Sequence, residues 1–111
     1  MSRGSEVRRP TKKSEYRIVF ASRDAERGWN DLLAVQRNAI VDAWDSLTRE
    51  PLREDERCHS LRGELDTVVR AGVAHRQRQF ELVNGARIWF YVEAKTVHLI
   101  RVHTRHPNET K

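Results

Sequence analysis

Arginine and histidine are the residues through which this 111-residue chain could do chemistry, and many of them gather in its last third. Residues 76–106 contain three strand-like runs that close on the segment His103-Thr104-Arg105-His106. RNA can be cleaved through its own 2′-hydroxyl when a base removes the hydroxyl proton, cations stabilise the extra charge on the phosphorane, and an acid protonates the 5′-oxygen. Histidine suits both proton transfers because its ordinary pKa of ~6.5 lies near neutral pH. We therefore take His103 and His106 as the candidate acid and base.

A second set of candidates comes from the alternating run at residues 87–92. One face of this run carries Arg87, Trp89 and Tyr91, and the other face is apolar. The planar fork of an arginine matches a phosphate, and aromatic rings can stack on unpaired bases. We place Trp89, Tyr91 and Arg101 among the RNA-binding candidates. The alternative is that both rings pack against the neighbouring strand and that the histidines are ordinary surface groups.

Metal and cofactor chemistry finds little support in the sequence. Cys58 is the lone cysteine, which excludes an internal disulfide and argues against a cysteine-based zinc site. His98, His103 and His106 have spacings that a metal could use, but among acids only Glu109 accompanies them. There is no glycine-rich phosphate loop, no G-x-S-x-G and no H-E-x-x-H motif. We expect neither a metal nor a cofactor.

The charge of the chain is segregated. Residues 1–17 carry a net charge of +4, residues 18–75 carry −3, and residues 76–111 carry +4. A basic tail and a basic final segment favour a polyanionic partner. The alternative is a solvated surface in a protein that prefers arginine, which supplies 17 of its 21 basic residues.

The elements that must position these residues follow from hydrophobic spacing. Residues 15–21 alternate as a strand, and two helices follow, with Ser22 as the first N-cap and a break near Ala34-Val35. Gly28 weakens the first helix by about 1 kcal/mol relative to alanine and leaves room for a close neighbour. The second helix must stop near Glu50, because the following Pro51 disfavours a helical residue before it.

The sequence of the second half of the chain predicts strands and turns. Residues 51–66 are polar and irregular, residues 67–69 suit a short strand, and residues 73–83 suit a longer one. Asn84-Gly85 predicts a tight hairpin turn, and residues 93–96 predict a second reversal before the last strand. The predicted class is α+β, in the order β-α-α-β-β-β, with an antiparallel sheet and the helical hairpin packed on one face.

Length and composition indicate one domain. Residues 1–14 lack a hydrophobic pattern and are predicted to form a flexible basic tail before a single domain at residues 15–111. No apolar run reaches the ~18 residues of a membrane span, and no apolar segment follows the basic N-terminus as it would in a secretory signal. We expect a cytoplasmic protein without a membrane partner.

The order of elements, together with three short motifs, resembles the RelE/ParE superfamily of type II toxin–antitoxin toxins, and its RelE-like branch in particular. Leu61-Arg62-Gly63 resembles a recurring turn before the sheet of that family. The run at residues 87–92 resembles its R-[LIV]-x-[YF]-x-[VI] strand, and residues 102–106 resemble its last core strand with a basic, often histidine-containing end. The match covers about residues 15–110.

This resemblance implies an endoribonuclease toxin that cleaves mRNA in the ribosomal A site and is held inactive by an antitoxin. Arg87 matches the arginine that holds the scissile phosphate, and Arg105 matches the arginine at the end of the last strand. Arg78 matches the first of two basic positions on the strand before Arg87. Phe80 stands at the second basic position, and the C-terminal segment has no tyrosine, so His103 or His106 would supply proton transfer. DNA would be met only indirectly, through the antitoxin.

Two other functions remain open at this point. A ParE-like toxin would inhibit DNA gyrase by contact and would not need the arginine and histidine rim. A non-toxic module of the same fold would only bind an antitoxin-like protein.

Overall fold

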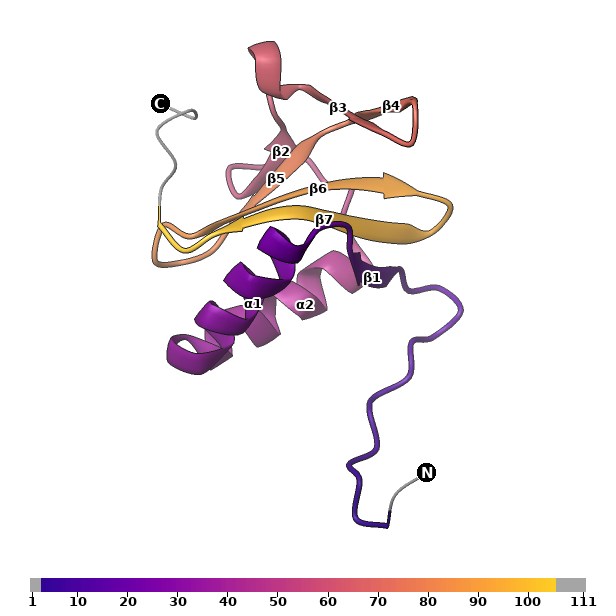
Figure 1. Cartoon of the computed structure of the whole chain (residues 1–111), viewed down its shortest axis with the longest axis vertical. Coiled ribbons are helices and arrows are strands. Elements are labelled where there is room, and N and C mark those ends of the chain that lie inside the picture. Colours follow the sequence, from indigo (N-terminus) through magenta and orange to yellow (C-terminus); the bar gives the residue numbers. More distant parts are fainter. Residues whose placement is uncertain (1–2, 106–111) are drawn as a thin grey trace.

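The computed structural model describes residues 3–105 and has the α+β class that the sequence predicts. Its elements in chain order are β1 (Arg17–Phe20), α1 (Arg23–Val35), α2 (Arg37–Arg49), β2 (Cys58–Ser60), the 3-10 helix η1 (Gly63–Leu65), β3 (Thr67–Arg70), β4 (Val73–Arg76), β5 (Arg78–Glu81), β6 (Arg87–Glu93) and β7 (Thr96–His103). Five strands form one sheet in the order β1-β7-β6-β5-β2, and β3 and β4 form a separate ribbon. Figure 1 shows the two helices packed together beside β7, with the ribbon at the opposite side of the molecule.

The two helices begin and end where the sequence predicts. The Ser22 side chain caps α1 by accepting a hydrogen bond from the backbone N–H of Ala25, at 3.0 Å. Gln36, the only residue between the helices, has a non-helical backbone and separates them at the predicted break. The second helix ends at Arg49, two residues before the proline that disfavours its continuation.

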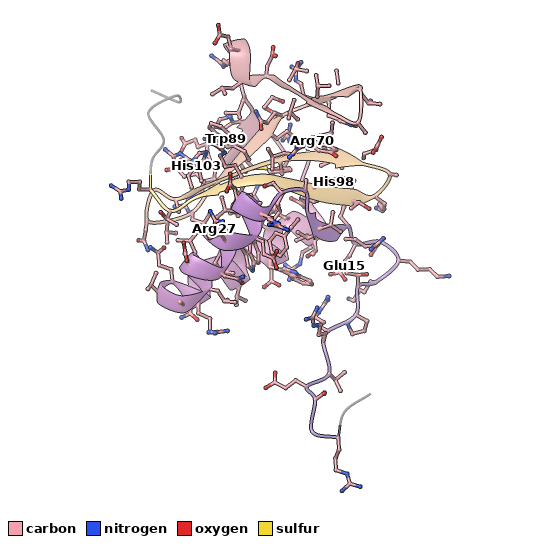
Figure 2. The ribbon with its side chains drawn as sticks, viewed as in Figure 1. Glu15, Arg27, Arg70, Trp89, His98 and His103 are labelled. Carbon is pink, nitrogen blue, oxygen red and sulfur yellow. The ribbon has the colours of Figure 1, made fainter. Side chains whose placement is uncertain are left out.

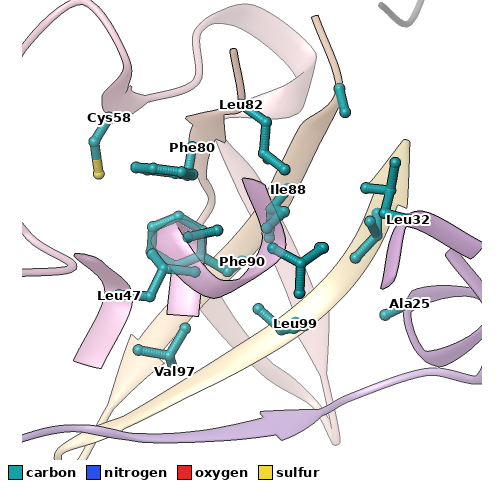
Figure 3. Close-up of a cluster of buried hydrophobic side chains, with 14 residues drawn as sticks. Ala25, Leu32, Leu47, Cys58, Phe80, Leu82, Ile88, Phe90, Val97 and Leu99 are labelled. Carbon is teal, nitrogen blue, oxygen red and sulfur yellow. The ribbon is translucent and has the colours of Figure 1, made fainter. Parts of the chain in front are cut away.

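The core lies between these helices and one face of the sheet (Figure 3). Its largest fully buried side chains include Phe90 from β6, Leu99 from β7, Leu32 from α1 and Leu47 from α2. We call this side of the sheet the core face and the opposite side the outer face. The predicted alternation of residues 87–92 is confirmed, because Ile88 and Phe90 are fully buried in the core cluster.

The sheet is mixed, and the prediction of an antiparallel sheet was wrong in one respect. β1 pairs with β7 in the parallel direction, with Ile18 opposite Val97, while the other pairs in the sheet are antiparallel. The alternation of a strand reports which face is buried and carries no information on the direction of its neighbour. The sequence therefore predicted the strand and could not predict its orientation.

The predicted strand at residues 73–83 is two strands, separated at Gln77. The backbone N–H of Gln77 donates to the carbonyl of Asp66, its side-chain amide donates to the carbonyl of Leu65, and its carbonyl accepts from the N–H of Leu61. These bonds to the segment around η1 take the place of ladder bonds to β6. The chain therefore leaves the sheet before Gln77, and β4 pairs with β3 instead. β3 ends at Arg70, one residue beyond the predicted end of this short strand.

The predicted loop at residues 51–66 also contains structure. Cys58–Ser60 forms β2 at the edge of the sheet, with Cys58 opposite Phe80. Three residues are too few to show a period, and their partner lies about twenty residues away in sequence. This strand was not visible in the local pattern for that reason.

Both predicted chain reversals are confirmed. The turn before β6 has Gly85 at a φ of 86°, and its N–H donates to the carbonyl of Leu82. The turn before β7 has positive φ at both Ala94 and Lys95, which is the backbone of a primed hairpin turn.

The segment before β1 has no helix or strand between residues 5 and 16, and Figure 1 shows it running away from the body of the protein. Arg9 makes an ion pair with Glu15 at 3.1 Å, and its guanidinium lies 5.6 Å from the centre of the Trp44 ring. The division of the chain at residue 15 stays a prediction. No helix within residues 3–105 has the length and apolar character needed to span a membrane.

Candidate functional site

A row of three polar side chains crosses the outer face of the sheet. Glu81 of β5 stands opposite Arg87 of β6, and Arg87 stands opposite His103 of β7. Residues directly opposite one another on paired strands project to the same face, with Cβ atoms about 5 Å apart. The row therefore places a carboxylate, a guanidinium and an imidazole side by side.

Arg87 is the centre of this row and is poised to bind an anion. Its side chain is 9% exposed, and its Nη1 lies 2.6 Å from Oε2 of Glu81. Its Nε is buried and has no hydrogen-bond partner among the residues that the structure describes. Leaving such a donor unmet costs about 1–3 kcal/mol.

A bulge in β7 brings the last member of the row to the outer face. Phe90 is opposite Leu99, whereas Trp89 is opposite Arg101, so Ile100 is an extra residue in the ladder. Without this extra residue the alternation would turn Arg101 and His103 toward the core. The bulge re-aims both side chains to the outer face, as bulges beside functional sites commonly do.

The bulge is held in place by the first helix. The hydroxyl of Ser22 donates to the carbonyl of Ile100 at 2.6 Å, while the same oxygen caps α1. One residue thus joins the start of α1 to the irregular point of β7. This contact links the helix to the orientation of His103.

A cleft of about 1020 Å³ opens beside the row. Both Glu81 and Arg87 line it, and much of the rest of its lining comes from residues 54–65, a segment that contains β2 and η1. Its other charged, imidazole and amide groups belong to Glu54, Asp55, Glu56, His59, Arg62, Arg76 and Gln79. The cleft is polar and is lined by groups of both signs of charge.

The predicted base-stacking rings are not open to solvent. Trp89 is 5% exposed, donates its ring N–H to Oε1 of Gln79 at 2.9 Å, and meets the ring of His103 edge-on at 4.3 Å. Tyr91 is 6% exposed and lies between the stacked rings of His75 at 4.0 Å and His98 at 4.5 Å. Figure 2 places Trp89, His98 and His103 along β6 and β7. The rings pack against neighbouring strands, which is the alternative that the sequence left open.

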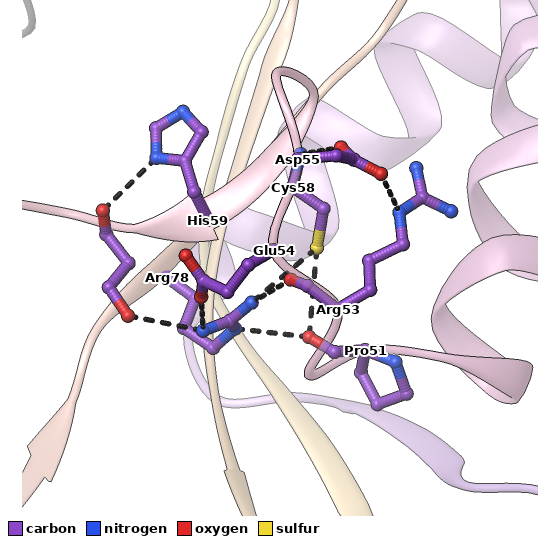
Figure 4. A network of polar contacts seen from close by, with 8 residues as sticks. Pro51, Arg53, Glu54, Asp55, Cys58, His59 and Arg78 are labelled. Atoms are coloured by element: carbon purple, nitrogen blue, oxygen red, sulfur yellow. Dashed lines mark hydrogen bonds and ion pairs between the residues drawn. The ribbon is translucent and has the colours of Figure 1, made fainter.

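Arg78 belongs to the core face, and its prediction as an RNA-binding residue needs correction. It is opposite Phe90 and is 6% exposed. Its guanidinium donates to the carboxylate of Glu54 at 2.6 Å, to the carbonyl of Pro51 at 3.0 Å and to the hydroxyl of Ser60 at 3.1 Å (Figure 4). These bonds lock the segment after α2 onto β5 and leave Arg78 turned away from Arg87.

Three predicted site residues remain, of which two are exposed near the end of β7 and one lies outside the described residues. Arg101 is exposed on the outer face opposite Trp89, and Arg105 is exposed in a bend just beyond the end of β7. His106 lies outside the described residues. The structure thus brings Arg87 and His103 together, with Arg101 and Arg105 at the same end of β7.

Sequence reasoning missed Glu81 and His59 as members of the site. Glu81 had a signal, because its alternation with Phe80 and Leu82 places it on the outer face next to the start of β6. His59 had none, because it reaches the cleft only through the pairing of β2 with β5.

Metal ligation and a cysteine nucleophile gain no support from the described residues. No group of three or more His, Cys, Asp or Glu side chains that could hold a metal occurs among residues 3–105. Cys58 is fully buried, and this burial raises the pKa of its thiol even though Arg78 nearby opposes the shift.

Comparison with known proteins gives one structural likeness. A scan of protein-family models and a search of curated proteins gave no match. Among solved structures, the chain is similar to a copper-bound mutant toxin from Helicobacter pylori, with a TM-score of 0.57 and 13% sequence identity over 79% of this chain and 92% of that chain. This likeness shows a shared fold.

Proposed function

We propose that this chain is the toxin of a type II toxin–antitoxin system and that it inhibits translation by cleaving mRNA at the ribosome. The observation that carries the proposal is the buried guanidinium of Arg87, which lines a polar cleft and has a donor that no group within residues 3–105 satisfies. The fold shared with a bacterial toxin supports the same reading.

The chemistry assigned to the site follows from the row and its flanks. Arg87 would bind the scissile phosphate and stabilise the charge that develops on it. His103 stands directly across from Arg87 and would supply proton transfer. Arg101 and Arg105 are exposed at the same end of β7 and would hold neighbouring phosphates of the RNA.

An antitoxin is the expected protein partner. An acidic or extended segment that covers the outer face would place a carboxylate near Arg87 and exclude RNA from the cleft. Ribosome and mRNA would be the targets of the free toxin, and the pair would meet DNA only through the antitoxin.

Primer extension on translated mRNA after induction tests this proposal. Wild type is expected to give discrete cleavage products, and Arg87→Ala is expected to remove them. His106→Ala tests the candidate beyond the described residues, and Arg27→Ala is the matched control, because this arginine is 72% exposed on α1.

Equal cleavage by wild type and Arg87→Ala would remove the assigned site. Loss of gyrase supercoiling without RNA cleavage would favour the ParE-like function instead.

A further inference from the structure

Four arginines among the described residues are not exposed, and one of them lacks what the other three have. Arg53, Arg78 and Arg87 each pair with a carboxylate, at 2.8, 2.6 and 2.6 Å. Arg70 of β3 has no carboxylate partner in the described part of the chain. The one hydrogen bond of its guanidinium there runs from Nη2 to the carbonyl of Ala21, at 3.3 Å, and its Nε is buried without a partner. Arg70 is therefore a half-buried positive charge that the described residues do not neutralise.

Arg70 faces the outer side of the sheet, because the ribbon of β3 and β4 packs there. His75 of β4 stacks on the outer-face ring of Tyr91, with the ring centres 4.0 Å apart. Val68 of β3 stands opposite His75, and residues two apart on a strand share a face, so Arg70 points toward the sheet as His75 does. From the ribbon beside β6, the side chain reaches the chain just after β1. It therefore crosses β7, which lies between those two strands.

We propose that Arg70 binds a second phosphate of the RNA strand whose scissile phosphate is held by Arg87. This inference rests on the proposed function and adds a binding site that lies outside the polar row and the cleft. A guanidinium presents two parallel donors that match two oxygens of a phosphate, and phosphate supplies the negative charge that the surroundings of Arg70 lack.

The spacing of the outer face suits a strand that touches both arginines. Arg101 of β7 stands one strand and two ladder positions from Arg87. Ala21, which holds Arg70, is one strand farther, because its N–H donates to the carbonyl of Leu99 on β7. With about 3.3 Å per residue and about 4.8 Å per strand, the backbones of Arg87 and Ala21 are roughly 12 Å apart.

This separation corresponds to a short stretch of RNA. Phosphates of one strand are about 3.4 Å apart along the axis of a stacked helix, and they lie farther apart when the strand is unstacked. Arg70 would therefore meet a phosphate about two or three nucleotides from the one on Arg87, with Arg101 between them.

The charges near this second site favour a ligand with several negative groups. Arg23, the first residue of α1, is exposed two positions after Ala21, and Arg101 is exposed on the outer face. The first-turn carboxylate of Asp24 pairs with Arg27 at 3.4 Å. A nucleic acid strand would meet these cations together through successive phosphates.

The ribbon that carries Arg70 is held by its contacts with the sheet. A two-stranded ribbon is marginally stable alone. The ring of Tyr91 lies between those of His75 at 4.0 Å and His98 at 4.5 Å, and Gln77 bonds to the segment around η1. His75 is therefore a positioning residue for Arg70.

The test measures binding of a short oligoribonucleotide to the purified full-length protein. The RNA is protected from cleavage by 2′-O-methyl groups, and its phosphates are replaced one at a time by neutral methylphosphonates. In wild type, the phosphate at Arg87 and a second one about two or three nucleotides away are expected to be sensitive, each losing about tenfold in affinity. In Arg70→Gln, the second replacement should change affinity by less than about twofold, while the first keeps its effect.

Three further variants separate the contact from general effects of charge and folding. Arg70→Lys keeps the charge without the planar fork and should keep part of the second effect. His75→Ala should weaken the second effect and leave the first unchanged. Arg49→Gln removes an exposed arginine from the last turn of α2 and should keep the whole wild-type pattern. Urea titration checks that each variant is folded.

The outcomes distinguish this site from the proposed function. If Arg70→Gln keeps the wild-type pattern, the second site is overturned and the ribonuclease function stands. If wild type binds a glutamate peptide of equal charge more tightly than the RNA, and Arg70→Gln loses that binding, Arg70 belongs to an interface with an acidic protein segment and the phosphate assignment is overturned. If wild type neither binds RNA nor gives primer-extension products, the proposed function and the second site fall together.

Discussion

Two buried arginines of one small protein have opposite surroundings. The guanidinium of Arg78 donates to a carboxylate, a hydroxyl and two backbone carbonyls, and these bonds offset the cost of removing a charge from water. Arg87 is buried to a similar degree, yet its Nε stays unmet within the described residues. The surroundings of Arg78 are those expected of an arginine that stabilises the fold. The surroundings of Arg87 are those expected of an arginine that binds a ligand.

Replacing Arg78 should therefore affect folding and spare binding. Arg78→Met removes the guanidinium that donates to the carbonyl of Pro51 and to the hydroxyl of Ser60. We expect the free energy of unfolding to fall by about 1–3 kcal/mol in urea titrations. Arg57→Met, a change of an exposed arginine in the same loop, should stay within about 0.5 kcal/mol of wild type. Weaker RNA binding by folded Arg78→Met would show that Arg78 belongs to the site after all.

Replacing Arg87 should give the reverse pattern. Arg87→Met removes a buried donor that no other described residue satisfies, and it keeps most of the packing volume of the side chain. We expect the free energy of unfolding to stay within about 1 kcal/mol of wild type, or to rise, while RNA affinity falls. Urea titration and a filter-binding assay on the same preparation would measure both. A large loss of stability would mean that the Glu81 ion pair is structural.

At the scale of elements, the junction of α1 and β7 determines how the outer face is built. Ser22 caps the helix and holds the bulge, so Ser22→Ala removes two hydrogen bonds of one oxygen. We expect a loss of about 1–2 kcal/mol in the free energy of unfolding. Cleavage should also slow in the protein that remains folded, because His103 depends on the bulge. Ser14→Ala, an exposed serine before β1, is the control for which neither quantity should change.

Gly28 lets α1 approach β7 closely, as its position in the sequence suggested. A Cβ atom added at Gly28 would lie 2.2 Å from the carbonyl oxygen of Val102, so backbone would have to move. We expect Gly28→Ala to lower the free energy of unfolding by about 1–3 kcal/mol, despite a gain of about 1 kcal/mol in helix propensity. Asn30→Ala on the exposed side of the same helix should be neutral or slightly stabilising in the same urea titrations. A Gly28→Ala protein as stable as wild type would contradict this packing.

The secondary-structure elements also show which parts of the fold could be predicted from the sequence and which could not. Both helices, their break and the two reversals follow from local rules on caps, proline and turn residues. The split at Gln77 and the strand β2 depend on partners distant in sequence, which local periodicity does not report. The bulge at Ile100 decides which face His103 occupies, yet no residue in that run marks it. The position of Arg87 on the outer face could be predicted from the alternation of its strand. The alignment of Glu81, Arg87 and His103 in one row could not.

At the scale of the whole molecule, the distribution of charge and the packing of the helices favour one side of the sheet as the proposed RNA-binding side. The middle segment, which contains both helices, carries a net charge of −3, and the final segment with β5 to β7 carries +4. The helices cover the core face, so the outer face near the end of β7 is where a polyanion would meet arginines such as Arg101 and Arg105.

The salt dependence of RNA binding tests whether this side is the one that binds. Each phosphate contact to a single strand contributes about 0.7 to the slope of log affinity against log salt concentration, because bound counterions are released. Arg101→Gln should lower that slope by about 0.7, since its side chain is exposed on the outer face. Arg27→Gln removes the same charge from α1, where the arginine pairs with Asp24 at 3.4 Å, and should leave the slope unchanged. Equal reductions in the two variants would mean that net charge attracts the RNA without a defined face, and that the outer face is not the binding surface.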